Sequence, residues 1–222
     1  MIWQRVYTML FETVIDTASG QRRNVALRHI KSGEIVLREP IEYYVNRKKT
    51  AWVETLINHE LANNEAAFMD LMPQCHDQYT ATNITVNISA NVANTGKRGV
   101  KHDTTRCTQE LALFYYKIVR NAFNVKIDGE SYAAILYAGR LFNHSCVPNI
   151  KFRVVSCGQN GQGERSKVKK YAMEFYACRD IKAGDEMLDH YFDCDLPYRE
   201  RYACSTTYYG FVCQCRKCVD RE

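Results

Sequence analysis

The chain has 222 residues, of which 46% are hydrophobic and 25% are charged, a composition that suits one globular domain with an ample core. Its net charge of +5 is mild, and no block of lysine and arginine is long enough to indicate direct nucleic-acid binding. No segment approaches the ~20 consecutive apolar residues of a membrane span, and the first residues lack the pattern of a secretory signal. We therefore expect an intracellular protein, in the nucleus or the cytoplasm, with no membrane partner.

The first 46 residues are predicted to form strands. A polar turn at residues 31–34 separates two extended runs, 25–30 and 35–37, a pattern that is typical of a β-hairpin. From residue 50 the apolar positions take helical spacing, which continues to about residue 73.

Residues 82–92 alternate between apolar and polar side chains, but they are rich in asparagine, so an edge strand and a loop both remain open. A helix is predicted from about 104 to about 122, where an apolar stripe recurs at helical spacing. A shorter helix at 132–141 is predicted to lead into the next segment.

Two β-rich runs, 150–156 and 171–178, flank a polar loop that contains glycine, and this pattern predicts a hairpin with a long tip. Residues 50 to about 125 are therefore expected to be a mainly helical insert inside a β-rich frame. The sequence has no visible internal repeat.

The stretch Asn143–Asn149 concentrates amide, imidazole, hydroxyl and thiol groups directly after the apolar run 134–142. A buried polar group that lacks a partner costs roughly 1–3 kcal/mol, so these groups must satisfy one another or a ligand. A self-capped turn is the simpler interpretation of an Asn-His pair. Two motifs that are distant in the sequence argue instead that this stretch belongs to a functional site.

The first distant motif is the C-terminal spacing Cys213-x-Cys215-x2-Cys218. The other cysteines are scattered, and ten in all are too few for a small disulfide scaffold, so a reducing compartment is expected. Three clustered thiolates favour one structural zinc ion over a disulfide, and the fourth ligand must come from elsewhere in the chain.

The second distant motif, Gly184–Asp193, is predicted to be a turn followed by a strand that carries Tyr191. A lone phenol in such a strand is usually part of the core. The three motifs together, in this order, are more specific than any one of them.

In this combination the chain resembles the SET-domain protein lysine methyltransferases, most closely the SET-and-MYND subgroup. The Asn-His-Ser-Cys-x-Pro-Asn motif stands at 143–149, the Gly-Glu-Glu…Tyr-x-Asp motif at 184–193, and the Tyr-x-Phe-x-Cys-x-Cys-x2-Cys motif at 209–218. Residues 25–40 resemble the opening strands, and the helix at 109–125 resembles the segment that precedes the Asn-His motif.

The resemblance implies an α+β, β-rich SET fold of small curved sheets, in which a knot-like C-terminal crossing brings the Asn-His stretch beside the strand of Tyr191. It implies a SET domain over 1–205, with an insert at about 47–125, and a zinc-binding post-SET segment over 206–222. No zinc-ligand spacing of a MYND module is present between 47 and 108, so a minimal SET plus post-SET protein is expected.

The resemblance also implies roles for single residues. The residues expected to contact the cofactor S-adenosylmethionine are Asn143, His144, Asn121, Arg23, Asn24 and Phe211. The lysine channel is expected to be lined by Tyr209, Phe211 and Tyr191, with Tyr191 as the catalytic phenol. The expected ligands of one structural Zn2+ are Cys146, Cys213, Cys215 and Cys218.

The implied reaction is methyl transfer from S-adenosylmethionine to the ε-amine of a lysine in a protein substrate, histone or non-histone. A free lysine at pH 7 must lose its proton at a cost of about 4–5 kcal/mol, which an apolar aromatic channel reduces by disfavouring the charged amine. The Tyr191 hydroxyl would orient the amine, and no strong general base is needed.

One departure from the family pattern is the opening loop, where Gly-x-Gly is replaced by Gln21-Arg22-Arg23-Asn24. Asn24 is expected to stand in for glycine by adopting the left-handed conformation. The altered loop favours an alternative function, a catalytically silent SET-like module that binds protein and keeps zinc for structure. A zinc-stapled DNA-binding protein has little support without a basic recognition helix. The sequence does not identify the substrate, the number of methyl groups added or the oligomeric state.

Overall fold

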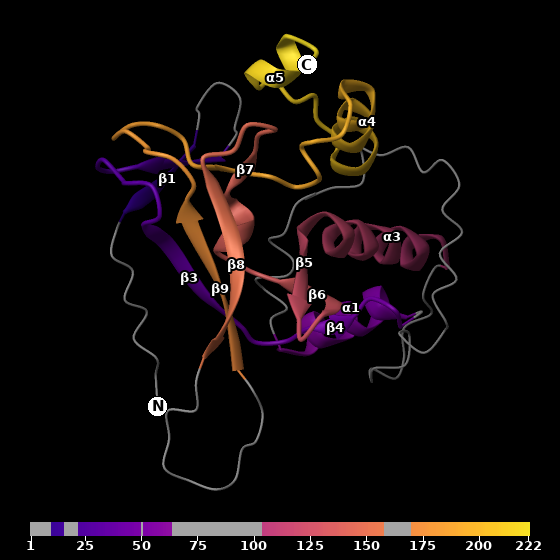
Figure 1. The fold of residues 1–222 in the computed structure, drawn as a ribbon. Helices are drawn as coiled ribbons and strands as arrows, with labels where there is room; N and C mark the ends of the chain where they lie inside the picture. Colours follow the sequence, from indigo (N-terminus) through magenta and orange to yellow (C-terminus); the bar gives the residue numbers. More distant parts are fainter. Residues whose placement is uncertain (1–9, 16–21, 50, 64–103, 158–169) are drawn as a thin grey trace, which may run out of the picture. The chain divides into compact units, whose positions relative to one another are not determined.

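The computed structural model describes residues 10–15, 22–49, 51–63, 104–157 and 170–222 (Figure 1). The chain divides into two compact units, one formed by Met1–Glu42 with Leu136–Glu222 and the other by Tyr43–Ile135. None of the helices in the described ranges is long and apolar enough to cross a membrane. The predicted segments 64–73 and 82–92 lie outside the described residues.

The first unit is built on three small sheets. Their strands are β1 (Phe11–Ile15) with β2 (Arg22–Ala26), β3 (Ile35–Ile41) with β9 (Lys170–Ala177) and β8 (Ile150–Cys157), and β7 (Asn143–His144) with β10 (Leu188–Asp189). The short helical elements are η3 (Gly139–Leu141), α4 (Tyr198–Ala203), the π-helical turn η4 (Cys204–Tyr209) and α5 (Arg216–Val219). These small sheets with short helices confirm the predicted β-rich α+β fold.

The hairpin predicted from the β-rich runs near 150 and 171 is confirmed. β8 and β9 pair antiparallel along their whole length, from Ile150 opposite Ala177 to Cys157 opposite Lys170. The inner face of this pair supplies the core of the unit, because Ile150, Met173 and Phe175 are fully buried. β3 pairs with the other edge of β9.

The hairpin predicted around the turn at 31–34 is wrong. The turn itself forms, with the Glu34 N–H donating to the Lys31 carbonyl and Gly33 at a φ of +86°. The strands on its two sides nevertheless pair elsewhere, β2 with β1 and β3 with β9. Local turn residues specify a change of direction, but cross-strand packing selects the partner strand.

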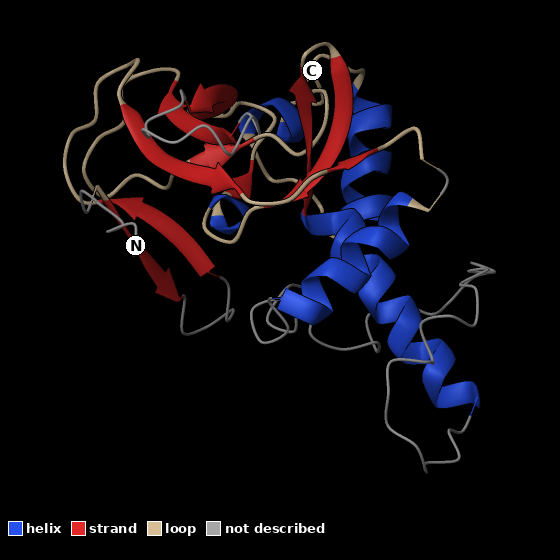
Figure 2. Ribbon diagram, turned by 90° about the horizontal axis from the view of Figure 1, so that it is seen from below, coloured by secondary structure: helices blue, strands red, loops and turns tan. Residues whose placement is uncertain are grey.

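The second unit combines two helices with a three-stranded sheet. Helices α1 (Trp52–Asn63) and α3 (Thr104–Asn121) pack against each other (Figure 2). The side chains of Leu56, Ile57 and Ile118 are buried. The sheet has the order β4 (Val45–Asn46), β6 (Glu130–Ile135) and β5 (Ala122–Ile127).

The helix predicted at 132–141 is also wrong, because β5 and β6 form an antiparallel hairpin in this region. Asp128 and Gly129 connect the strands with φ values of +48° and +85°. Two successive positive φ values make a type I′ turn, for which Asp-Gly is a preferred sequence. The sequence prediction did not use this dipeptide, which would have indicated the hairpin, and only η3 in the later part of the segment is helical.

Gly139 makes a close approach in the core of the first unit. A Cβ atom at this position would lie 2.5 Å from Cζ of Phe175, whose ring is fully buried between Phe142 and Phe152 at centroid distances of 5.2 and 5.8 Å. We expect Gly139→Ala to lower the free energy of unfolding in urea by about 1–3 kcal/mol, because the ring has no free space to move into. In a Phe175→Leu background the same substitution should cost less, and equal costs in both backgrounds would contradict the clash.

Candidate active site and metal centre

The polar stretch Asn143–Asn149 is held by residues that are distant in the sequence. β7 lies parallel to β10, with Asn143 opposite Leu188 and His144 opposite Asp189. Next along the chain, the Ser145 N–H donates to the Asp189 carbonyl over 2.8 Å. One local turn is present, in which the Val147 N–H donates to the Ser145 hydroxyl, but a self-capped turn does not account for the rest.

Asn149 fastens the end of the stretch to the same segment. Its side-chain oxygen accepts from the Leu188 N–H over 2.7 Å, and its amide group donates to the Glu186 carbonyl over 2.8 Å. Its backbone N–H donates to the Leu188 carbonyl. The side chain is buried, so these bonds satisfy polar groups that water does not reach.

Asn143 joins three segments through one amide group. Its Nδ2 donates to the Arg22 carbonyl over 2.6 Å and to Oε1 of Glu186 over 2.8 Å. The start of β2, the Asn-His stretch and the turn after Gly184 therefore meet at this side chain. The backbone of β2 is linked to the same turn, because the Met187 N–H donates to the Asn24 carbonyl.

Tyr191 is fixed at both its backbone and its hydroxyl. The hydroxyl donates to the Phe142 carbonyl over 2.8 Å, and the backbone N–H donates to Nδ1 of His144 over 3.0 Å. Burial, with a smaller contribution from Asp189, raises the pKa of Tyr191 above its usual value, so the side chain is a neutral phenol at pH 7. Burial, with a smaller contribution from His190, lowers the pKa of His144 to about 4, so its neutral ring accepts the Tyr191 N–H.

Aromatic rings from the C-terminal segment surround Tyr191. The ring centroids of Tyr209 and Phe211 lie 5.1 and 6.2 Å from that of Tyr191, and the Tyr209 hydroxyl donates to the Tyr191 carbonyl. The ring centroid of Phe192 lies 4.3 Å from that of His144 and 6.1 Å from that of Tyr209. Phe192 was not among the residues predicted for the site, although it directly follows Tyr191 in the chain. These rings form an apolar environment of the kind that favours a neutral amine over a charged one.

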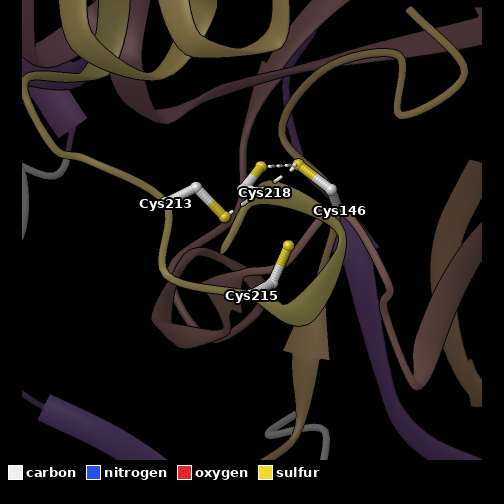
Figure 3. A group of neighbouring side chains, drawn as sticks. All are labelled: Cys146, Cys213, Cys215 and Cys218. Atoms are coloured by element: carbon white, nitrogen blue, oxygen red, sulfur yellow. Dashed lines mark hydrogen bonds between the residues drawn. The ribbon is translucent and has the colours of Figure 1, made fainter. Parts of the chain in front are cut away.

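The four predicted zinc ligands converge. The sulfur atoms of Cys146, Cys213, Cys215 and Cys218 all lie within 4.8 Å of one another and point toward a common centre (Figure 3). Cys146 Sγ is 3.5 Å from Cys218 Sγ and 3.9 Å from Cys213 Sγ. Tetrahedral zinc with Zn–S bonds of about 2.3 Å requires sulfur separations of ~3.8 Å, so this set of donors fits the ion. The described cysteines are all free, and no disulfide competes within that part of the chain.

The cluster and the aromatic site share a contact. Nε2 of His144 lies 3.3 Å from Cys146 Sγ, while Nδ1 of the same ring holds the Tyr191 backbone. Cys213, Cys215 and Cys218 belong to the segment that also carries Tyr209 and Phe211. A metal ion on the four sulfurs would therefore crosslink this segment to the Asn-His stretch.

The other residues predicted to contact the cofactor lie in β2 and at the end of α3. Asn24 has the extended conformation of β2, so the prediction that it adopts a left-handed conformation is wrong. Its Oδ1 accepts from the Thr13 hydroxyl over 2.7 Å, which fixes the side chain within the β1–β2 hairpin. Arg23 is exposed on the same strand. Asn121 ends α3 in the second unit, where its Nδ2 donates to the Lys117 carbonyl over 2.8 Å.

The motifs and their geometry agree with one family model, that of the SET domain, which matches residues 22–192. The chain belongs to the SET domain family. The matched range of this SET protein includes β2, the Asn-His stretch and Tyr191, and it ends before the C-terminal cysteines.

The SET protein is similar to several curated proteins over part of their length. It is 36% identical over 115 residues to L678 of Acanthamoeba polyphaga mimivirus, which is named as a SET domain-containing protein, and this match covers 52% of the chain and 38% of the viral protein. It is 28% identical over 121 residues to the histone-lysine N-methyltransferase SET5 of Vanderwaltozyma polyspora, covering 47% and 21% of the two chains. It is 29% identical over 114 residues to the N-lysine methyltransferase SMYD2-A of Xenopus laevis, covering 50% and 23%.

The matched region thus spans well under half the length of these relatives. Among solved structures, the SET domain of LSMT bound to lysine and AdoHcy aligns over 83% of this SET protein and 50% of that chain, with 16% identity and a TM-score of 0.49.

An ion pair between half-buried His190 and buried Asp189 borders the aromatic site and makes a pH-dependent prediction. His190 Nδ1 lies 3.1 Å from Oδ1 of the buried Asp189, and this hydrogen bond raises the pKa of His190 above its usual value of 6.5. A raised pKa means that the protonated ring stabilises the folded state below about pH 6.5 and that this contribution is lost as the pH rises through the folded pKa. An NMR titration should show the elevated pKa and its decrease in Asp189→Asn.

The control variant is Asp180→Asn, because Asp180 pairs with His29 and not with His190. It should leave the raised pKa of His190 unchanged. An unchanged pKa of His190 in Asp189→Asn would contradict the assigned ion pair.

Proposed function

We propose that this SET protein transfers a methyl group from S-adenosylmethionine to the ε-amine of a lysine in a protein substrate, histone or non-histone. The observation that supports this best is the parallel β7–β10 pairing, next to which a neutral, fixed phenol lies among aromatic rings beside Asn143 and His144. The relatives named as histone-lysine and N-lysine methyltransferases agree with this reaction.

The proposed cofactor contacts are Asn143, His144 and Phe211, together with Arg23, Asn24 and Asn121. One orphaned donor fits a ligand in this region. Nδ2 of Asn24 is buried and has no hydrogen-bond partner in the described part of the protein. A buried donor left unpaired costs about 1–3 kcal/mol, so an acceptor group on a bound molecule would relieve it. When bound, the cofactor would supply an activated methyl group on a positively charged sulfur.

The proposed role of the protein is to present a neutral amine in line with that methyl group. The rings of Tyr191, Tyr209 and Phe211 would enclose the lysine side chain and disfavour its charged form by desolvation. With its pKa raised, Tyr191 stays a protonated phenol at pH 7, so it would not take the proton of the amine and would act by holding the amine in position. The amine would lose its proton to solvent before it enters.

The zinc ion proposed for the cysteine cluster would have a structural task. It would hold the segment of Tyr209 and Phe211 against the Asn-His stretch, through Cys146 and the neighbouring His144. We accordingly propose a SET domain over 1–205, with its insert at about 47–125, and a post-SET segment over 206–222.

A specific observation favours a second function, a silent SET-like module that binds protein. β2 is regular strand from Arg22 to Ala26, with an arginine and an asparagine in place of the glycines expected near the cofactor. Side chains at these positions restrict how closely a ligand approaches the backbone. A module of this kind would keep zinc without binding S-adenosylmethionine.

Calorimetric titration of S-adenosylmethionine into zinc-loaded protein separates the two functions. We expect micromolar binding, and much weaker binding of ATP, which shares the adenosine but lacks the sulfonium. Labelled S-adenosylmethionine should then transfer methyl groups to lysine-containing peptides on an array. Absence of cofactor binding by folded, zinc-loaded protein would overturn the enzyme and leave the silent module.

A further inference from the structure

A fully buried arginine lies next to the cysteine cluster. Arg201 is carried by α4, and only 1% of its surface is exposed. An arginine remains charged at every pH that a folded protein experiences, so the positive charge itself is buried. Burial of an ion is unfavourable unless an opposite charge or a complete set of hydrogen bonds compensates for it.

The partners of Arg201 do not include a side-chain carboxylate within the described residues. Nη1 donates to the Leu196 carbonyl over 2.5 Å, and Nη2 donates to the backbone oxygens of Lys217 over 3.4 Å and of Glu222 over 2.5 Å. Nε is buried and lacks a hydrogen-bond partner in the same part of the chain. The bonds hold the C-terminal residues to α4, yet they leave the charge of the guanidinium without a side-chain counterion.

One further contact of Arg201 is with a cysteine of the cluster. Nη2 lies 4.0 Å from Sγ of Cys218, the sulfur that is itself 3.5 Å from Cys146 Sγ. The thiol form of these cysteines offers the guanidinium no counterion. Loading of a zinc ion would release the remaining thiol protons to solvent, and four thiolates around one divalent cation carry a net double negative charge.

We propose that Arg201 is a positioning residue for the metal centre, whose buried guanidinium neutralises part of the negative charge of the zinc-loaded cluster. The inference rests on the proposed zinc site and is independent of methyl transfer. It gives the buried cation a counterion that no side-chain carboxylate supplies within the described residues, because the cluster becomes negative when the metal binds. Groups that act on metal ligands from outside the coordination sphere typically change metal affinity by about 10–100-fold.

Other cations near the cluster are placed differently. Nζ of Lys217 donates to the Cys194 carbonyl over 2.7 Å. Arg216 has a side chain that is 91% exposed and pairs with Asp220. Solvent therefore screens the charge of Arg216, whereas the charge of Arg201 is not screened. This difference makes Arg216 a matched control.

The test compares zinc affinity and apo stability in Arg201→Met, Arg201→Lys and Arg216→Met. Zinc dissociation constants are measured by competition with a chromophoric chelator, and unfolding of the zinc-free and zinc-loaded proteins is measured in urea. We expect Arg201→Met to weaken zinc binding by about 10–100-fold. Arg201→Lys, which keeps the charge, should recover a large part of that loss, and Arg216→Met should bind zinc like the wild type.

A charge-compensating role and a packing role for Arg201 predict different stabilities for the zinc-free protein. If Arg201 compensates the loaded cluster, Arg201→Met destabilises the zinc-loaded protein more than the zinc-free protein. Equal destabilisation of both forms, with wild-type zinc affinity, would overturn the proposal in favour of a packing role. If Arg201→Met does not fold, the test uses Arg201→Lys, with Cys218→Ser as the reference that lacks one zinc ligand. A loss of zinc affinity in Arg201→Lys as large as the loss in Cys218→Ser would also overturn the proposal. A wild type that binds no zinc would overturn the zinc site itself.

Discussion

Replacing Tyr191 with phenylalanine should lower the rate of lysine methylation by about 10²-fold or more while leaving the affinity for S-adenosylmethionine close to that of the wild type. The substitution removes only the hydroxyl, which donates to the Phe142 carbonyl over 2.8 Å and is proposed to orient the amine. The ring and its packing against Tyr209 remain. Calorimetric titration and single-turnover transfer of labelled methyl groups measure the two quantities.

The control for this prediction is Tyr208→Phe. Tyr208 precedes Tyr209 in the chain, but 62% of its surface is exposed, and it has no contact with the aromatic site among the described interactions. This variant should methylate at the wild-type rate. Full activity of Tyr191→Phe, measured under the same conditions, would remove Tyr191 from the proposed mechanism.

Replacing Cys146 with serine should weaken zinc binding by more than 100-fold and destabilise the folded protein, because it removes one of four donors from the centre. Cys146 is also the donor that would join the C-terminal segment to the Asn-His stretch, and its sulfur lies 3.3 Å from His144. We therefore expect the variant to bind S-adenosylmethionine more weakly as well. Metal analysis of purified protein should give one zinc per wild-type chain.

Cys204→Ser is the matched control for the metal prediction. Cys204 is free and half-buried like several other cysteines, but it lies outside the group of four. It should keep the zinc content and the cofactor affinity of the wild type. Wild-type zinc content in Cys146→Ser would show that the four sulfurs do not act as one site.

The elements that the sequence predicted best are those with a strong local pattern. The helix near 104–122 follows its apolar stripe and is found as α3 (Thr104–Asn121), and the β8–β9 hairpin follows two alternating runs. The wrong predictions involve choices that local patterns do not make. The turn at 31–34 is formed, but only the packed sheet determines that β3 pairs with β9.

The role of the β7–β10 pairing shows why the site could not be derived from short motifs alone. Asn143 and Glu186 are 43 positions apart, and each motif is compatible with an ordinary turn or strand. Their proximity was predicted only because the ordered motifs resemble those of a known family. The parallel pairing brings the motifs together, and the Asn143 amide then donates to Glu186 while the His144 ring accepts from the Tyr191 N–H.

The sequence by itself determined the local chemistry: three cysteines spaced to share one metal ion, and a tyrosine after a glycine turn. Only the tertiary structure decided which distant groups complete that chemistry. It brings Cys146, which only the family resemblance had linked to the other three cysteines, to the cluster. It also sets Phe192 beside His144 and buries Arg201 against Cys218, neither of which was predicted. The physical reason is that spacing along the chain shows only whether nearby residues can bind the same ion. Burial and charge compensation depend on how distant segments pack.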